Sequence, residues 1–166
     1  MSEPRFTVEP ISAEHHTDSF DCEQPSLNDW LKHRALKNHV ESYTHVRVVA
    51  SDSLILGYYG LSTASIPPDA MPRAVRGGQP PNPIPAILIG RFAVDRGWQG
   101  KGIGRLLFRD ALIRCVAAAD LVGARAVVIH ALDAKAAAFY HAHDFVATLA
   151  SPLTLYQAIQ RVRAAL

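Results

Sequence analysis

The N-terminal third of the chain shows apolar patterns typical of short strands and of one amphipathic helix. Residues 6–10 predict a first short strand. Apolar side chains then recur at the spacing of one helical face, in the order Leu27, Trp30, Leu31 and Ala35. Ser26 is the predicted N-cap of this helix, with Asp29 three residues later as its capping-box partner. Residues 46–50 and 54–62 are apolar runs around a short polar turn, which predicts a hairpin.

The C-terminal half predicts alternating strands and helices. The predicted elements are a strand at 86–94, a helix at 103–119, a strand at 126–132, a helix at 134–141, a strand at 153–156 and a terminal helix at 157–166. The first of these strands is almost continuously apolar, which indicates burial on both faces. The strand–helix–strand–helix order is typical of parallel βαβ pairing.

We expect the long helix at 103–119 to be largely buried against the sheet, because apolar residues occupy both of its sides. Phe108 and Leu112 lie on one side, and the other side carries Ile103, Leu106, Leu107, Ala111 and Ile113. Asp110 and Arg114 are spaced i, i+4 in this helix, so we expect them to form an ion pair.

Residues 66–85 contain seven prolines and the pair Gly77–Gly78, so this segment predicts a loop without regular structure. A loop of this length inside a compact domain is usually functional or disordered, and a substrate-facing lid is one interpretation. Its two arginines, Arg73 and Arg76, either contact a substrate or only contribute to solubility.

Composition narrows the class of protein. The chain has 166 residues, of which 49% are hydrophobic and 19% charged, so it predicts one packed domain. A net charge of +2 says little about partners, and the eight histidines show no spacing typical of metal ligands. The two cysteines predict no disulfide framework, which favours a cytoplasmic protein. The segment MSEPRFTVEP lacks the pattern of a signal peptide, and no apolar run approaches the roughly 20 residues of a membrane span.

The segment from Gln99 to Gly104 is a glycine run between a predicted strand and a predicted helix. Glycines allow a close backbone approach, and the first N–H groups of a helix have no partner within the helix, so this segment predicts an anion site for a diphosphate. A P-loop would require a Lys-Ser or Lys-Thr pair after the glycines, and none follows. A dinucleotide fold would place its glycines early, after the first strand. Coenzyme A remains as the third interpretation.

With the preceding Phe92-Ala-Val-Asp95, this run resembles motif A of the GCN5-related N-acetyltransferases (GNAT). The resemblance implies a central mixed, mostly antiparallel sheet with a splayed parallel pair and flanking helices, in one α/β (α+β) domain over residues 1–166. It also implies acetyl-CoA as the acetyl donor, without a metal. Its diphosphate would bind the backbone of Gln99, Gly100, Lys101, Gly102, Ile103 and Gly104, and its pantetheine arm the strand residues Phe92, Ala93 and Val94.

A second segment resembles motif B of the same family. It runs from Asp133 through Phe139-Tyr140 to Phe145. The resemblance implies that Asp133 and Phe139 lie near the acyl carrier and that Tyr140 protonates the departing thiolate. A phenol is neutral at pH 7 and suits this role. Tyr140 as a core aromatic and Asp133 as a helix N-cap remain alternatives. Asp144 stands where the family usually has glycine, and Asp tolerates a positive φ better than most residues.

The N-terminal half resembles the toxin branch of the family. The similar segments are Phe20-x-Cys22, Leu27-x-x-Trp30-Leu31, Tyr58-Tyr59-Gly-Leu61 and Pro83-Ile-Pro85 to Asp95, while Glu23 departs from the usual glycine. The resemblance implies a toxin that acetylates the α-amine of aminoacyl-tRNA and blocks translation. It also implies a ribbon-helix-helix antitoxin and a homodimer.

Basic residues are the candidates for tRNA contacts, namely Lys32, Arg34, Lys37, Arg73, Arg76 and Arg91. The first three lie on the polar side of the predicted helix, which is either a solvated face or a surface for an acidic partner. Arg91 lies within a strand and is held by an internal acid or lies beside the acceptor.

The residues identify the acceptor less directly than the donor. An α-amine has a pKa near 8, well below that of lysine, so it needs less help to become a neutral nucleophile. His130 is a candidate general base, although a buried structural histidine is the expected role. An N-acetyltransferase for a small amine or a protein N-terminus is the alternative enzyme, and a non-catalytic binding module is a third possibility.

Overall fold

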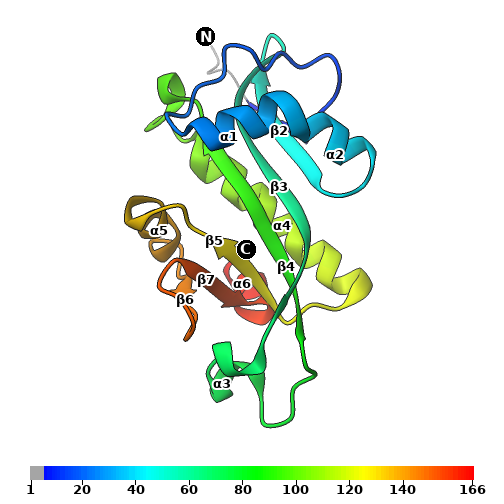
Figure 1. Cartoon of the computed structure of the whole chain (residues 1–166), viewed down its shortest axis with the longest axis vertical. Coiled ribbons are helices and arrows are strands. Elements are labelled where there is room, and N and C mark those ends of the chain that lie inside the picture. The colour runs from blue at the N-terminus through cyan, green and yellow to red at the C-terminus, as the bar shows by residue number, and fades with distance from the viewer. Residues whose placement is uncertain (1–5) are drawn as a thin grey trace. The chain divides into compact units, whose positions relative to one another are not determined.

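The computed structural model describes residues 6–166, and within this range seven strands form one sheet in the order β1-β2-β3-β4-β5-β7-β6 (Figure 1). The strands are β1 (Val8–Pro10), β2 (His45–Ser51), β3 (Leu54–Ile66), β4 (Ile84–Val94), β5 (Ala126–His130), β6 (Val146–Ala147) and β7 (Thr154–Ala158). β4 and β5 pair in parallel, whereas β1–β2, β2–β3, β5–β7 and β6–β7 are antiparallel. The predicted mixed sheet with a parallel pair is therefore confirmed.

The α-helices are α1 (Pro25–Trp30), α2 (Leu36–Val40), α3 (Arg73–Arg76), α4 (Ile103–Val122), α5 (Ala134–His141) and α6 (Ile159–Ala165). In the described part of the chain, no helix is long and apolar enough to cross a membrane. The prediction about a signal peptide rests partly on residues 1–5, which lie outside the described residues.

The chain divides into two compact units. The first takes in the described residues up to Leu61 together with Arg91–Ala111, and the second takes in Ser62–Gly90 and Leu112–Leu166. β3, β4 and α4 each begin in one unit and end in the other.

The predicted hairpin is confirmed in the first unit. β2 and β3 pair from His45↔Leu61 to Ser51↔Leu54. The connecting residues Asp52 and Ser53 have φ of 48° and 69°, which gives the twist that a tight antiparallel hairpin needs.

The helical segment of the first unit begins differently from the prediction. Its N-cap is Gln24 without a side-chain hydrogen bond, and Pro25 occupies the first helical position, so the predicted Ser26 cap is wrong. Proline suits this position because its φ is already helical and the missing N–H has no partner there. A π-helical segment, Leu31–Ala35, joins α1 to α2, and its terminal residues are the predicted core positions, 2% and 0% exposed.

The core of the second unit lies under the parallel pair. β4 and β5 are in register from Ala86↔Ala126 to Ile89↔Ile129. Four of the five β5 residues are buried, and the strand ends at His130, short of the predicted residue 132.

The proline-rich segment contains more regular structure than predicted. Pro68 begins a 3₁₀-helix (Pro68–Ala70), Pro72 is the N-cap of α3, and β4 already begins at Ile84. Prolines at helix starts remove no helical hydrogen bond, so these prolines initiate short helices. Met71, only 1% exposed, lies in the core of this unit.

Helix α4 corrects two predictions. The apolar pattern predicts Ile113 on the buried side, but this side chain is 43% exposed. The Asp110–Arg114 pair is also wrong. Asp110 instead accepts a hydrogen bond from Arg47 Nε at 2.9 Å and another from the buried hydroxyl of Tyr59.

Candidate functional site

The glycine run lies at the start of α4 and presents open backbone. Gly100 and Gly102 have φ of 74° and 88°, and no atom lies within 4 Å of the position where a Cβ would stand on either residue. The first helical hydrogen bond runs from Leu106 N to Gly102 O at 3.1 Å. The N–H groups of Ile103, Gly104 and Arg105 therefore precede the helical ladder and are oriented toward the helix start.

A network of hydrogen bonds fixes the turn before these glycines. The Asp95 carboxylate accepts from Gly97 N at 2.8 Å and from Asp21 N at 3.0 Å. Gln99 Nε2 donates to Val94 O at 3.0 Å and so ties the run back to β4. The sequence prediction did not assign this role to Asp95, although its position before a short helical turn is a capping signal.

The residues of this segment fit a diphosphate. α4 has 20 residues and no acidic side chain in its first turn, so its positive dipole end is not neutralised. Lys101 adds a cation, with Nζ 5.1 Å from the centre of the Trp98 ring. Glycine backbone, preceding helical N–H groups and a lysine together make an anion cradle.

The strand residues predicted to hold an acyl arm are well anchored. Ala93 is 5% exposed and belongs to the core of the first unit. Phe92 packs edge-on against Phe108, with ring centres 5.8 Å apart. Val94 O already accepts the Gln99 side chain, so a ligand at this carbonyl would have to use its second lone pair.

Helix α5 in the second unit carries the candidate acid. Asp133 is its N-cap and accepts from Ala136 N at 2.8 Å, which confirms the capping interpretation. Tyr140 is 6% exposed and packs edge-on against Phe139 at 5.4 Å. Burial raises the pKa of Tyr140 well above its ordinary value, so the phenol stays protonated at neutral pH. Asp144 has φ of 69°, as expected for its turn.

Arg91 takes part in an aromatic stack in the first unit. Its guanidinium lies over the Trp30 ring, 5.1 Å from the centre. The Tyr58 ring stacks on the Trp30 ring, with ring centres 5.9 Å apart and an interplanar angle of 11°. Tyr58 is fully buried, and its hydroxyl donates to Leu27 O at 2.7 Å. The sequence analysis placed Trp30 on the apolar face of the helix and in a segment similar to the toxin branch, but it missed this stack.

His130 is exposed at the end of β5, so the expectation of a buried structural histidine is wrong. Its neighbours Ile129 and Ala131 are buried, whereas the His130 side chain is exposed and its Nδ1 lies 3.3 Å from Thr154 Oγ1. Among residues 6–166, no group of three His, Cys, Asp or Glu side chains is placed to hold a metal ion.

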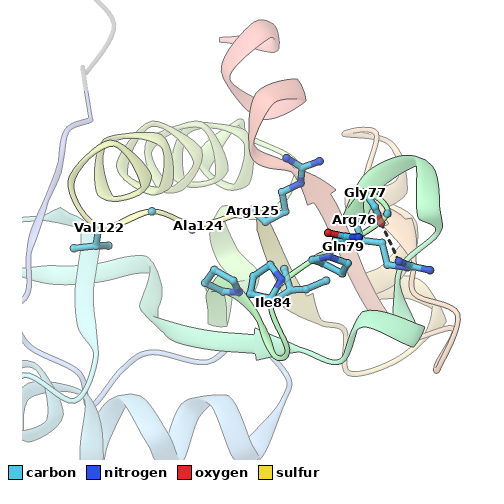
Figure 2. A pocket seen from close by; sticks show the side chains of 12 residues that line it. Arg76, Gly77, Gln79, Ile84, Val122, Ala124 and Arg125 are labelled. Atoms are coloured by element: carbon cyan, nitrogen blue, oxygen red, sulfur yellow. Dashed lines mark hydrogen bonds between the residues drawn. The ribbon is translucent and has the colours of Figure 1, made fainter.

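The other candidate cations fall on both units. Lys32, Arg34 and Lys37 are exposed in the helical segment of the first unit. Arg76, in the second unit, lines a cavity of about 630 Å³ between the proline-rich segment and the turn before β5 (Figure 2). Arg125 also lines this cavity, and sequence analysis did not identify it.

Comparisons with known proteins identify the family of this chain. Residues 42–147 match the model of the acetyltransferase (GNAT) domain. A tRNA-acetylating toxin of Mycobacterium tuberculosis (strain ATCC 25618 / H37Rv) is 42% identical over 154 residues, which cover 93% of this chain and 92% of the relative.

Two solved structures have the same fold. The Y145F mutant of KacT matches with a TM-score of 0.92 and 24% identity, over 98% of this chain and 100% of that chain. AtaTR bound with AcCoA matches with a TM-score of 0.84 and 25% identity, over 96% of this chain and 97% of that chain. This chain therefore belongs to the GNAT acetyltransferase family.

Proposed function

We propose that the chain is an acetyl-CoA-dependent toxin that acetylates the α-amine of aminoacyl-tRNA and thereby blocks translation. The observation that carries this proposal is the 42% identity to a tRNA-acetylating toxin over 93% of the chain. Aminoacyl-tRNA is a cytoplasmic substrate, so we place the protein in the cytoplasm. The family model spans parts of both compact units, which supports the proposal that residues 1–166 work as one domain.

The donor site follows from the cradle. The backbone of residues 99–104 would bind the diphosphate, and Phe92, Ala93 and Val94 the pantetheine arm. When bound, acetyl-CoA supplies an activated thioester carbonyl. Asp133 already caps α5, and we propose that it and Phe139 also line the path of the arm.

Tyr140 is the proposed general acid. The neutral α-amine forms a bond to the acetyl carbon, the carbon–sulfur bond breaks, and the phenol donates its proton to the sulfur. The acceptor nitrogen then loses its extra proton to solvent. The Tyr140 phenolate takes up a proton from solvent, which restores the phenol. Burial keeps the phenol protonated, and a protonated phenol is the form this step requires.

The acceptor is held by cations in this proposal. Lys32, Arg34, Lys37, Arg73, Arg76 and Arg91 would contact the tRNA. The exposed His130 remains the candidate for a base, although an α-amine with a pKa near 8 is partly neutral without one.

The test is mass spectrometry of aminoacyl-tRNA after incubation with the purified protein and acetyl-CoA. We expect acetylated aminoacyl-tRNA from the wild type. Tyr140→Phe should lower kcat by about 100- to 10,000-fold while acetyl-CoA binding is kept. Unmodified aminoacyl-tRNA, together with acetylation of a small amine or a peptide N-terminus, would replace the toxin with an ordinary N-acetyltransferase.

Two partners complete the proposal. A toxin of this kind needs an inhibitor during growth, and we propose a ribbon-helix-helix antitoxin, which co-expression and co-purification would test. A homodimer stays a prediction, for which the measured molar mass in solution is decisive.

A further inference from the structure

Three arginines of the second unit surround the corner between α3 and the pair Gly77–Gly78. Arg125 donates from Nε and Nη2 to Val75 O at 2.9 and 2.6 Å. Arg76 Nη1 donates to Gly77 O at 2.9 Å. Arg73 Nη2 lies 3.4 Å from the position where a Cβ on Gly78 would stand. Short bonds to the backbone thus hold two of these guanidinium groups in fixed positions.

These arginines have no carboxylate partner in the part of the chain that the structure describes. Arg163, on α6 of the same unit, is a useful contrast, because it forms two hydrogen bonds with Asp120 at 2.7 and 3.2 Å. Among the described residues, no acidic side chain lines the cavity beside the arginine corner either. Three cations without a counter-charge attract an anionic ligand.

The cavity adds an apolar floor to this charge. The cavity that Arg76 and Arg125 line is also lined by apolar side chains, which include Ile84 and Val122 (Figure 2) and the prolines Pro80, Pro81 and Pro85. Val122 is 77% exposed, so the apolar surface is open to a partner.

The shape favours a nucleic-acid backbone over an acidic peptide. Prolines carry no N–H, so this wall offers few donors to an extended peptide that would bind through its main chain. A guanidinium matches the geometry of a phosphate, and the apolar proline rings offer a surface against which a ribose can pack. Nη1 of Arg125 is not used by the two bonds to Val75 O.

We propose that this cavity binds the sugar–phosphate backbone of the tRNA, with Arg73, Arg76 and Arg125 contacting phosphates. The inference rests on the proposed function and deepens it. It adds Arg125 and the apolar wall to the acceptor surface. The cavity would bind the body of the tRNA and not its aminoacyl end. Removing an arginine of the cavity should therefore weaken tRNA binding but leave the reaction with a minimal acceptor unchanged.

The experiment compares wild type, Arg125→Gln and the control Arg163→Gln. Each protein acetylates two acceptors, a full aminoacyl-tRNA and an aminoacyl-adenosine that lacks the tRNA body. We expect Arg125→Gln to lower kcat/KM about 5- to 10-fold for the tRNA only, while Arg163→Gln behaves as the wild type. The slope of log Kd for deacylated tRNA against log salt should become shallower by about 0.7–0.9, the value for a single phosphate neutralised by one arginine.

A second variant separates binding from loop stability. Arg125→Gln also releases Val75 O from its two hydrogen bonds. Within residues 6–166 the Arg73 guanidinium forms no hydrogen bond to the backbone like those of Arg125, so Arg73→Gln should reduce the salt slope without lowering the melting temperature. Unchanged salt slopes in both variants would refute the cavity as an RNA site. The same conclusion would follow if the variants bound an acidic antitoxin segment more weakly but bound tRNA as the wild type does. A wild type that acetylates neither acceptor would refute the proposed function itself, and this inference with it.

Discussion

Replacing Gly102 by alanine tests whether the backbone N–H groups at the start of α4 bind acetyl-CoA. Gly102 has φ of 88°, a region in which L-residues are strained. No atom stands within 4 Å of the added methyl group, so the substitution introduces backbone strain without a clash. The change therefore acts on one variable, the preferred direction of the peptide groups that begin α4.

The magnitude follows from two limits. If the alanine keeps its positive φ, the free energy of unfolding falls by about 1–2 kcal/mol. If the backbone relaxes to a negative φ, the N–H groups that follow turn away from the cradle. A hydrogen bond to a charged group contributes about 1.5–3 kcal/mol, so the loss of one weakens acetyl-CoA binding roughly 10- to 150-fold.

Gly123→Ala is the matched control. Gly123 follows the other end of α4, with φ of 77° and no atom within 4 Å of its Cβ position. Calorimetry should show the weaker acetyl-CoA binding only for Gly102→Ala, while urea unfolding shows a similar loss of stability for both. Acetylpantetheine, which lacks the diphosphate, should bind all three proteins alike. Equal acetyl-CoA affinity in wild type and Gly102→Ala, without the loss of stability that a retained positive φ would cause, would refute the cradle as the diphosphate site.

Three further outcomes are expected. Asp110→Ala should lower the free energy of unfolding by about 3 kcal/mol in urea denaturation, because it leaves the half-buried charge of Arg47 without its partner. Tyr140 has a raised pKa, so its phenol stays protonated through the ordinary phenol range near 10. We therefore expect kcat/KM to rise with pH as the acceptor amine deprotonates, and to show no fall up to about pH 9. Trp30→Leu should raise the KM for aminoacyl-tRNA about 2- to 5-fold, and a double variant with Arg91→Ala should be no worse than Arg91→Ala alone.

The glycine turn before α4 could be predicted from sequence because it is local. The glycines, the helix start and the strand before them lie within a dozen residues, and the requirement for positive φ is visible in the residue type itself. The bounds of α5 were predicted for the same reason. Each depends on backbone preferences of adjacent residues.

Side-chain partners across long sequence separations could not be predicted. The i, i+4 rule assigned Asp110 to Arg114, but a partly buried carboxylate gains more from the Arg47 and Tyr59 groups of the neighbouring strands. Local patterns also failed for Ser26, since Pro25 moved the helix start, and for His130, since its side chain is exposed at the end of β5 although its neighbours Ile129 and Ala131 are buried.

This difference bears on how the two substrates should be tested. The proposed donor site consists of backbone groups at one helix start, whereas the proposed acceptor contacts depend on pairs 50 and 61 residues apart, Arg125 with Val75 O and Arg91 with Trp30. We therefore expect a substitution at Trp30 or Arg125 to alter acceptor binding and to leave the cradle unchanged. Acetyl-CoA binding alone is for this reason insufficient evidence that a variant retains its activity on tRNA, and each variant requires both measurements.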